Sequence, residues 1–285
     1  MITNTYNELN HSSVLFELVD YFDFIMKLHN SNKIPKVLML SGSKGIGKCT
    51  LVNHLMNYIF DKENYNLEKK TINEKSLFNN QYLINTFPNI VYLSGEKFTN
   101  VKIDDIRKLK SLLSKTTISN NKRFIILDDV EVFNQNSLNG LLKIIEEPSE
   151  NNYFILINNK SRPLIKTIQS RALELKIRIN EKKRIKIIQS LIKKNNFETS
   201  IDYNLTSVSP GNLVTYSNIL NDNKIDINGD FLFNLEKTLN LYKKNKNINF
   251  ANLSLFLTDL YFYKFKESNK CAFVFWPSRL LRMSK

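Results

Sequence analysis

A glycine-rich segment carries the clearest chemical signal in the sequence. Residues 42–50 read GSKGIGKCT and fit the pattern G-x-x-x-x-G-K, between an apolar run and a segment with helical spacing. Glycines in such a loop let backbone N–H groups surround phosphate oxygens, while the following helix start and a lysine supply positive charge. We therefore predict a phosphate-binding loop (the P-loop, residues 42–50) rather than an ordinary glycine-rich turn. Its predicted nucleotide-binding residues are Gly42, Gly45, Gly47, Lys48, Cys49 and Thr50.

The P-loop departs from its pattern at the position that normally offers a hydroxyl to Mg²⁺. That position is Cys49, and a thiol is a poor ligand for a hard cation that prefers oxygen donors. Thr50 follows, but it is turned by about 100° around the helix and should not substitute. We expect ATP or ADP to bind here with poorly positioned Mg²⁺.

Two acids, Asp128 and Asp129, end the apolar run that starts at Phe124. In P-loop proteins an aspartate at the end of such a strand holds Mg²⁺, so Asp128 is the candidate metal ligand. Asp129 stands where a glutamate usually polarises the attacking water, and a side chain shorter by one methylene can lose orders of magnitude in rate. The alternative is two acids that only end a strand; the P-loop upstream favours the nucleotide site.

Strand-like and helix-like segments alternate up to about residue 180. Apolar runs predict strands at 37–40, 89–93, 124–129, 153–158 and 172–177. Helical spacing of apolar residues predicts helices at 13–28, 48–60, 103–113 and 138–145, while residues 61–88 resemble a variable insertion. Continuous apolar strands between helices are typical of an α/β fold with a parallel sheet covered on both faces. After Asn180 only helical patterns remain, with breaks at 209–211 and 228–230.

Composition and charge set broad limits on function. The 285 residues carry a net charge of +14, which fits a nucleic-acid partner, although scattered lysines fit compositional bias equally well. No apolar run is long enough for a membrane span and the N-terminus lacks a signal-peptide pattern, so we expect a cytoplasmic protein without a membrane partner. The two cysteines, Cys49 and Cys271, lack partners at metal spacing, so neither zinc nor a disulfide is expected.

Four segments together resemble the clamp-loader subunits of the AAA+ P-loop family, above all those of the delta-prime type in bacterial DNA polymerase III. They are GSKGIGKCTL (42–51), IDDIRKLKSLLS (103–114), the run 124–159 with NGLLKIIEEPSE, and LIKTIQSRALEL (164–175). The resemblance implies an AAA+ core (1–178), a helical lid (179–222) and a helical collar (223–285). It also implies a heteropentamer with gamma/tau and delta subunits, which opens the sliding clamp and places it on primed DNA.

The same resemblance assigns two more site residues. Arg171 lies where the family has an arginine finger, which reaches a neighbouring subunit's ATP site and stabilises the developing phosphoryl charge. Taken alone, an arginine before a strand predicts only a surface ion pair. Asn158, or the next residue, occupies the sensor-1 region of the nucleotide site. The family's zinc-binding cysteines are missing from the 61–88 insertion, and Asn212 stands where a sensor arginine is often found.

Three functions compete at this point. The first is a ring subunit with weak or no ATPase activity of its own, which supplies Arg171 to its neighbour. The second is an ATP-hydrolysing motor of the gamma/tau type, which predicts Ser or Thr at position 49 and Glu at position 129. The third is an unrelated P-loop kinase for a small molecule, which needs clustered arginines in a lid and leaves NGLLKIIEEPSE unexplained. The residues at positions 49 and 129 favour the first.

Overall fold

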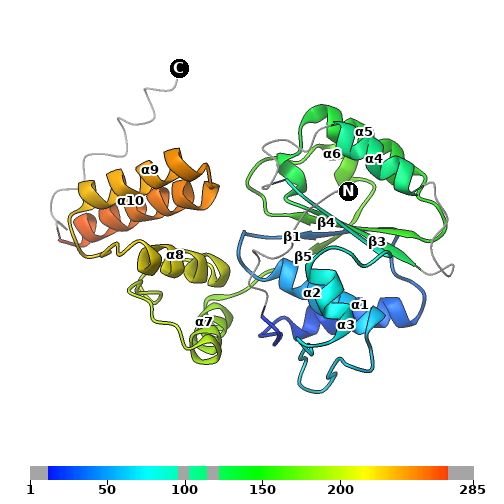
Figure 1. Ribbon diagram of the computed structural model, residues 1–285, viewed down its shortest axis with the longest axis horizontal. Coiled ribbons are helices and arrows are strands. Elements are labelled where there is room, and N and C mark those ends of the chain that lie inside the picture. Colours follow the sequence, from blue (N-terminus) through cyan, green and yellow to red (C-terminus); the bar gives the residue numbers. More distant parts are fainter. Residues whose placement is uncertain (1–11, 96–102, 114–121, 269–285) are drawn as a thin grey trace. The chain divides into compact units, whose positions relative to one another are not determined.

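The chain forms two compact units in a computed structural model that describes residues 12–95, 103–113 and 122–268. One unit comprises residues 1–196 with 209–211, and the other comprises residues 197–208 with 212–285. The first unit contains the whole sheet, and the second is helical (Figure 1). None of the helices in the described part of the chain has the length and apolar character that a bilayer crossing requires.

A five-stranded sheet with every neighbouring pair parallel forms the centre of the first unit. In spatial order its strands are β2 (Ile90–Ser94), β3 (Arg123–Asp128), β4 (Asn152–Asn158), β1 (Val37–Ser41) and β5 (Leu173–Lys176). Ser41 pairs with Asn158, and Ser94 pairs with Asp128. The carboxyl ends of the strands therefore meet at one edge, which brings the P-loop after β1 beside the acids after β3.

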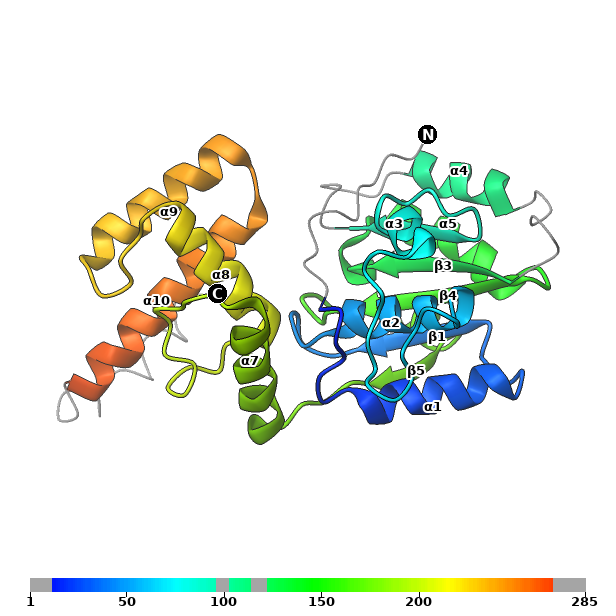
Figure 2. The same ribbon diagram turned by 60° about the horizontal axis from the view of Figure 1, so that its bottom comes forward.

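Helices cover both faces of this sheet, as Figures 1 and 2 show. On one face lie α1 (Val19–Asn30), α2 (Lys48–Phe60) and α3 (Leu77–Leu83); on the other lie α4 (Ile103–Leu113), α5 (Gln135–Glu146) and α6 (Lys166–Gln169). Alternate residues of β3 enter the two cores: Phe124 and Ile126 face α2, whereas Ile125 and Leu127 face α4 and α5. Burial on both faces explains why the inner strands are continuous apolar runs.

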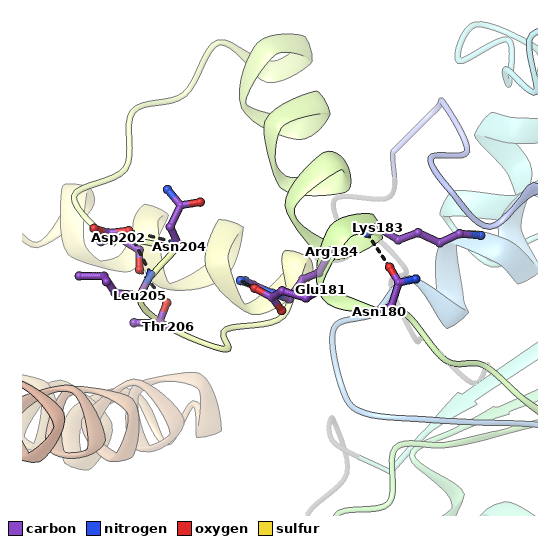
Figure 3. A network of polar contacts seen from close by, with 8 residues as sticks. All are labelled: Asn180, Glu181, Lys183, Arg184, Asp202, Asn204, Leu205 and Thr206. Carbon is purple, nitrogen blue, oxygen red and sulfur yellow. Dashed lines mark hydrogen bonds and ion pairs between the residues drawn. The ribbon is translucent and has the colours of Figure 1, made fainter.

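Side-chain caps fix where several helices begin. Asn180 accepts a hydrogen bond from the Lys183 N–H at 2.9 Å and so starts α7 (Glu181–Asn195) in the first unit. Within that first turn Glu181 pairs with Arg184, whose Nε donates at 2.8 Å (Figure 3). The acid at the helix start also complements the helix dipole.

The second unit consists of helices joined by short turns. Its Asp202 accepts from the backbone N–H of Asn204 and of Leu205, which forms a local turn before α8 (Pro210–Asp222) (Figure 3). Helix α9 (Phe231–Asn245) follows, and α10 (Ile248–Ser268) packs against it. A buried hydrogen bond of 2.8 Å joins the hydroxyls of Thr238 and Ser254 across this pair.

The predicted α/β architecture is confirmed, and the predicted start of the first helix needs correction. Helix α1 begins at Val19 rather than Ser13, because Leu15 and Ser13 form backbone hydrogen bonds with Lys70 and Ile72 instead. The 61–88 insertion contains the short helix α3, capped by Ser76. The division into core, lid and collar stays a prediction, and the collar's last residues, 269–285 with Cys271, lie outside the described residues.

Candidate nucleotide site

The P-loop leaves β1 through two tight glycine positions. The Gly42 N–H donates to the Asn158 carbonyl at 3.1 Å, and a Cβ on Gly42 would lie 2.6 Å from the carbonyl oxygen of Ile177. Gly47 has φ +99° and precedes α2 without a side-chain cap. Residues other than glycine rarely adopt this left-handed conformation, so the glycines at both positions are required by the backbone.

Lys48 points back into the loop that precedes it. Its Nζ donates to the carbonyl oxygens of Gly42 and Ser43, both at 2.7 Å, and the side chain is almost fully buried. Burial lowers the pKa of Lys48, while nearby Cys49 and the carboxylate of Asp128 act in the opposite direction. The ammonium group therefore lies under the P-loop, at the place where a lysine contacts phosphates in this motif.

The predicted metal ligand Asp128 is the centre of a buried hydrogen-bond cluster. Its Oδ2 accepts from the Cys49 thiol at 3.1 Å and from the Tyr92 hydroxyl at 2.9 Å, and its Oδ1 accepts from the Asp129 N–H at 2.9 Å. Burial raises the pKa of Asp128 and raises those of Cys49 and Tyr92 well above their ordinary values. The arrangement brings together Cys49 and Asp128, which were both named as site residues, and adds Tyr92, which the sequence pattern identified only as a strand residue.

This donor set does not match Mg²⁺. Mg²⁺ requires near-octahedral oxygen ligands and keeps several waters, whereas the thiol and the tyrosine hydroxyl both direct their protons at Asp128 Oδ2. A metal at Asp128 would compete with those donors for Oδ2, and the thiol of Cys49 would offer it a soft ligand in place of the usual hydroxyl.

The second acid, Asp129, is held by the turn after β4. Asp129 has a left-handed backbone (φ 52°) at the start of the short helix η3 (Val130–Val132), and the Asn159 side-chain amide donates to its Oδ1. By contrast, the Asn158 side chain accepts from the Lys160 N–H at 2.8 Å, within its own turn. Asn159 is thus the neighbour that contacts the acid, and the nucleotide-binding role of Asn158 stays a prediction.

Glu131 orders the same turn, and sequence patterns did not single it out. The buried Oε1 accepts from the N–H groups of Asn159 and Ser161, at 3.1 and 3.2 Å, and from the Ser161 hydroxyl at 2.7 Å. Three donors on one carboxylate oxygen fix residues 159–161 relative to η3. An acid two positions after Asp129 in a buried segment was the only sequence signal for this role.

Arg171 lies apart from the P-loop cluster, just before the edge strand β5. Its Nη1 donates to the Thr167 carbonyl of α6 at 2.9 Å, and its Nη2 pairs with the Glu146 carboxylate of α5 at 2.6 Å. The Arg171 side chain is 36% exposed, so the guanidinium is oriented yet accessible. Both interactions fit the surface ion pair that the local sequence predicts, and neither argues against a second role.

The P-loop also receives a contact from a segment far along the chain. The Gly211 N–H donates to the Gly45 carbonyl at 2.8 Å, and a Cβ on Gly211 would lie 3.0 Å from both the Cα and the carbonyl oxygen of Gly45. From its residues alone, the sequence predicts only a helix break at 209–211. In the structure Gly211 contacts the P-loop at Gly45.

Comparison with known proteins identifies the family. Residues 20–181, more than half of the chain, match the family model described as "DNA polymerase III, delta subunit". The DNA polymerase III subunit delta' of Buchnera aphidicola subsp. Schizaphis graminum is 25% identical over 234 residues, which cover 81% of this chain and 68% of that protein. The subunit delta' of Buchnera aphidicola subsp. Baizongia pistaciae is 26% identical over 174 residues, 60% of this chain and 49% of that protein.

A relative named as a gamma subunit matches over a similar length. The DNA polymerase III subunit gamma of Buchnera aphidicola subsp. Acyrthosiphon pisum is 26% identical over 180 residues, 62% of this chain and 48% of that protein. The chain thus spans about half the length of two of these three curated relatives. The match of the family model and the delta' relatives lead to one conclusion: the chain belongs to the DNA polymerase III delta-subunit family that this model describes, as a protein of the delta-prime type.

Proposed function

We propose that this chain works as a delta-prime-type subunit of the DNA polymerase III clamp loader. In this role it assembles with gamma/tau and delta subunits into a heteropentamer that loads the sliding clamp on primed DNA. It contributes Arg171 to the ATP site of a neighbouring subunit and hydrolyses little or no ATP itself. Such work on replicating DNA takes place in the cytoplasm. Family membership supports the assembly. The proposal that the chain assists a neighbour's hydrolysis but hydrolyses little ATP itself depends on one contrast: Arg171 is accessible, whereas Asp129 is buried and hydrogen-bonded.

The Arg171 guanidinium is held in place by its contacts with Glu146 and Thr167 but stays accessible to a ligand. Its ion pair with Glu146 joins two partly exposed side chains, 36% and 44% exposed. Such pairs contribute about 0–1 kcal/mol, so a phosphoryl group could replace the Glu146 carboxylate at little cost. An arginine finger acts through a planar, bidentate donor of this kind, directed at the charge that develops on the transferring phosphoryl group.

Asp129, by contrast, is poorly suited to activate water. Its carboxylate accepts from the Asn159 amide, its backbone is left-handed, and it is only 5% exposed. A general base must reach the proton that it abstracts, and a short side chain already bonded to an amide does so poorly. This supports a chain with weak hydrolysis over the gamma/tau-type motor.

The P-loop still supports the binding of nucleotide phosphates. Lys48 lies beneath the loop, and α2 starts without a side-chain cap, so its first N–H groups point at the loop. We propose ATP or ADP as the ligand of this loop, with a structural rather than a catalytic effect. Asn158 would line the same edge of the sheet at the end of β4.

The proposal is tested in the reconstituted clamp loader that carries Arg171→Ala. The site served by this residue should lose roughly a thousandfold or more of its hydrolysis rate, as measured for arginine fingers. The matched control is Arg162→Ala, which removes another exposed arginine and should leave the DNA-stimulated ATPase rate unchanged.

Arg171→Lys refines the test, because it keeps the charge and removes the planar fork. If Arg171→Ala and Arg162→Ala give the same rate, the finger role is refuted. Fast ATP hydrolysis by the isolated wild-type chain would favour the gamma/tau-type motor, and phosphate transfer to a small molecule would favour a kinase.

A further inference from the structure

The carboxylate that should bind Mg²⁺ already accepts hydrogen bonds from the protein on both of its oxygens. Asp128 is 4% exposed, and three donors contact its two oxygens: the Cys49 thiol, the Tyr92 hydroxyl and the Asp129 N–H. Tyr92, which is 1% exposed, comes from β2 and cannot turn to solvent without leaving the core. A cation bound to Asp128 would compete with these donors for the carboxylate oxygens, and each buried hydrogen bond that it displaced would cost free energy.

The phosphate-binding half of the site and its metal-binding half differ in whether they are suited to work with a cation. The phosphate-binding half consists of P-loop N–H groups, the N-terminus of α2 and the Lys48 ammonium, none of which requires a metal. The metal-binding half has lost its hydroxyl to Cys49 and has both oxygens of Asp128 occupied. The thiol therefore acts as a hydrogen-bond donor to the carboxylate and not as a ligand.

We propose that this chain binds the phosphates of ADP or ATP without Mg²⁺, so that its affinity for nucleotide does not depend on the cation. The inference rests on the nucleotide binding proposed above. It adds that the bound form is the nucleotide alone and not its Mg²⁺ complex. Lys48 and the helix N-terminus supply the positive charge that Mg²⁺ provides elsewhere. Cys49 and Tyr92 are the residues that exclude the metal.

The test is a titration of the full chain with ADP, once in excess MgCl₂ and once in EDTA. The expected dissociation constants agree within about twofold, which corresponds to well under the 1.4 kcal/mol of a tenfold change. Lys48→Ala should weaken binding in both buffers and so locate the ligand at the P-loop. A tenfold or larger gain in affinity with Mg²⁺ overturns the inference, and so does the absence of ADP binding in both buffers.

A double variant tests the cause. Cys49→Ser together with Tyr92→Phe restores a hydroxyl at the metal position and removes one donor from Asp128 Oδ2. Its affinity for ADP should become Mg²⁺-dependent, by about tenfold or more. If the folded double variant remains insensitive to Mg²⁺, Cys49 and Tyr92 do not exclude the metal and the inference fails. The wild-type comparison decides the question even if the variant does not fold, and neither result bears on the Arg171 test.

Discussion

Protonation of the buried His54 should weaken the first unit in mild acid. His54 lies on α2 with no exposed surface, and its Nε2 bonds to the Ser12 carbonyl at 3.0 Å while its Nδ1 contacts the Tyr65 hydroxyl at 3.0 Å. A neutral ring that donates at Nε2 accepts at Nδ1 and satisfies both contacts. Burial lowers the pKa of His54 from 6.5 to about 4, with a further contribution from the charge of Lys194.

The sign and size of the effect follow from linkage. Between pH 6.5 and 4 the unfolded chain binds a proton on this ring and the folded chain does not. The stability contributed by His54 is therefore complete above pH 6.5 and is lost as the pH falls towards 4. The full difference is about 3 kcal/mol, of which about 2 kcal/mol is lost between pH 7.5 and pH 5.

The assay compares wild type with His54→Gln, whose amide keeps polar contacts but does not titrate. The free energy of unfolding is measured in urea at pH 7.5 and at pH 5, so that carboxylates common to both proteins cancel. The free energy of unfolding of the wild type, minus that of His54→Gln, should fall by about 2 kcal/mol between pH 7.5 and pH 5. Parallel pH profiles would refute the claim that His54 stays neutral because of its burial.

Three further perturbations have expected outcomes. Asn134→Ala removes the side-chain cap of α5 and should lower the free energy of unfolding in urea by about 1 kcal/mol, whereas the exposed Asn136→Ala on the same helix should change it little. Gly211→Ala places a Cβ 3.0 Å from the backbone of Gly45, so hydrogen exchange at P-loop amides should become faster; unchanged exchange would show that the contact does not order the loop. Glu131→Ala leaves three donors without their acceptor and should destabilise by about 3 kcal/mol, with a smaller loss for Glu131→Gln; equal, negligible losses would contradict the ordering role.

The central sheet could be predicted because local pattern and tertiary burial agree there. Each inner strand is buried on both faces, so its sequence is a continuous apolar run that needs no knowledge of its neighbours. The start of α1 could not be predicted in this way. Residues 13–15 continue the apolar helical pattern, yet their backbone pairs with residues 70–72, and nothing local to the helix encodes that partner.

The candidate site shows the same contrast between features that local sequence encodes and features that distant contacts determine. The P-loop and the acids of β3 belong to sequence motifs tied to a strand end, so their meeting at the edge of the sheet follows from the parallel topology. The partners of the acids are set by contacts through space. Tyr92 lies on the neighbouring strand β2, and Asn159 lies in the turn after β4. The apolar pattern of these segments does not indicate that they contact Asp128 and Asp129.

The position of β1 between β4 and β5 has a consequence for the time at which this protein can fold. Val37 pairs with Phe154 and Leu38 with Leu173, so both neighbours of β1 are synthesised more than a hundred residues later. At about 5–20 residues per second, the apolar β1 strand waits on the order of ten seconds for its partners. During that interval the P-loop has no sheet to anchor it, and the unpaired apolar β1 strand is exposed to aggregation in the nascent chain.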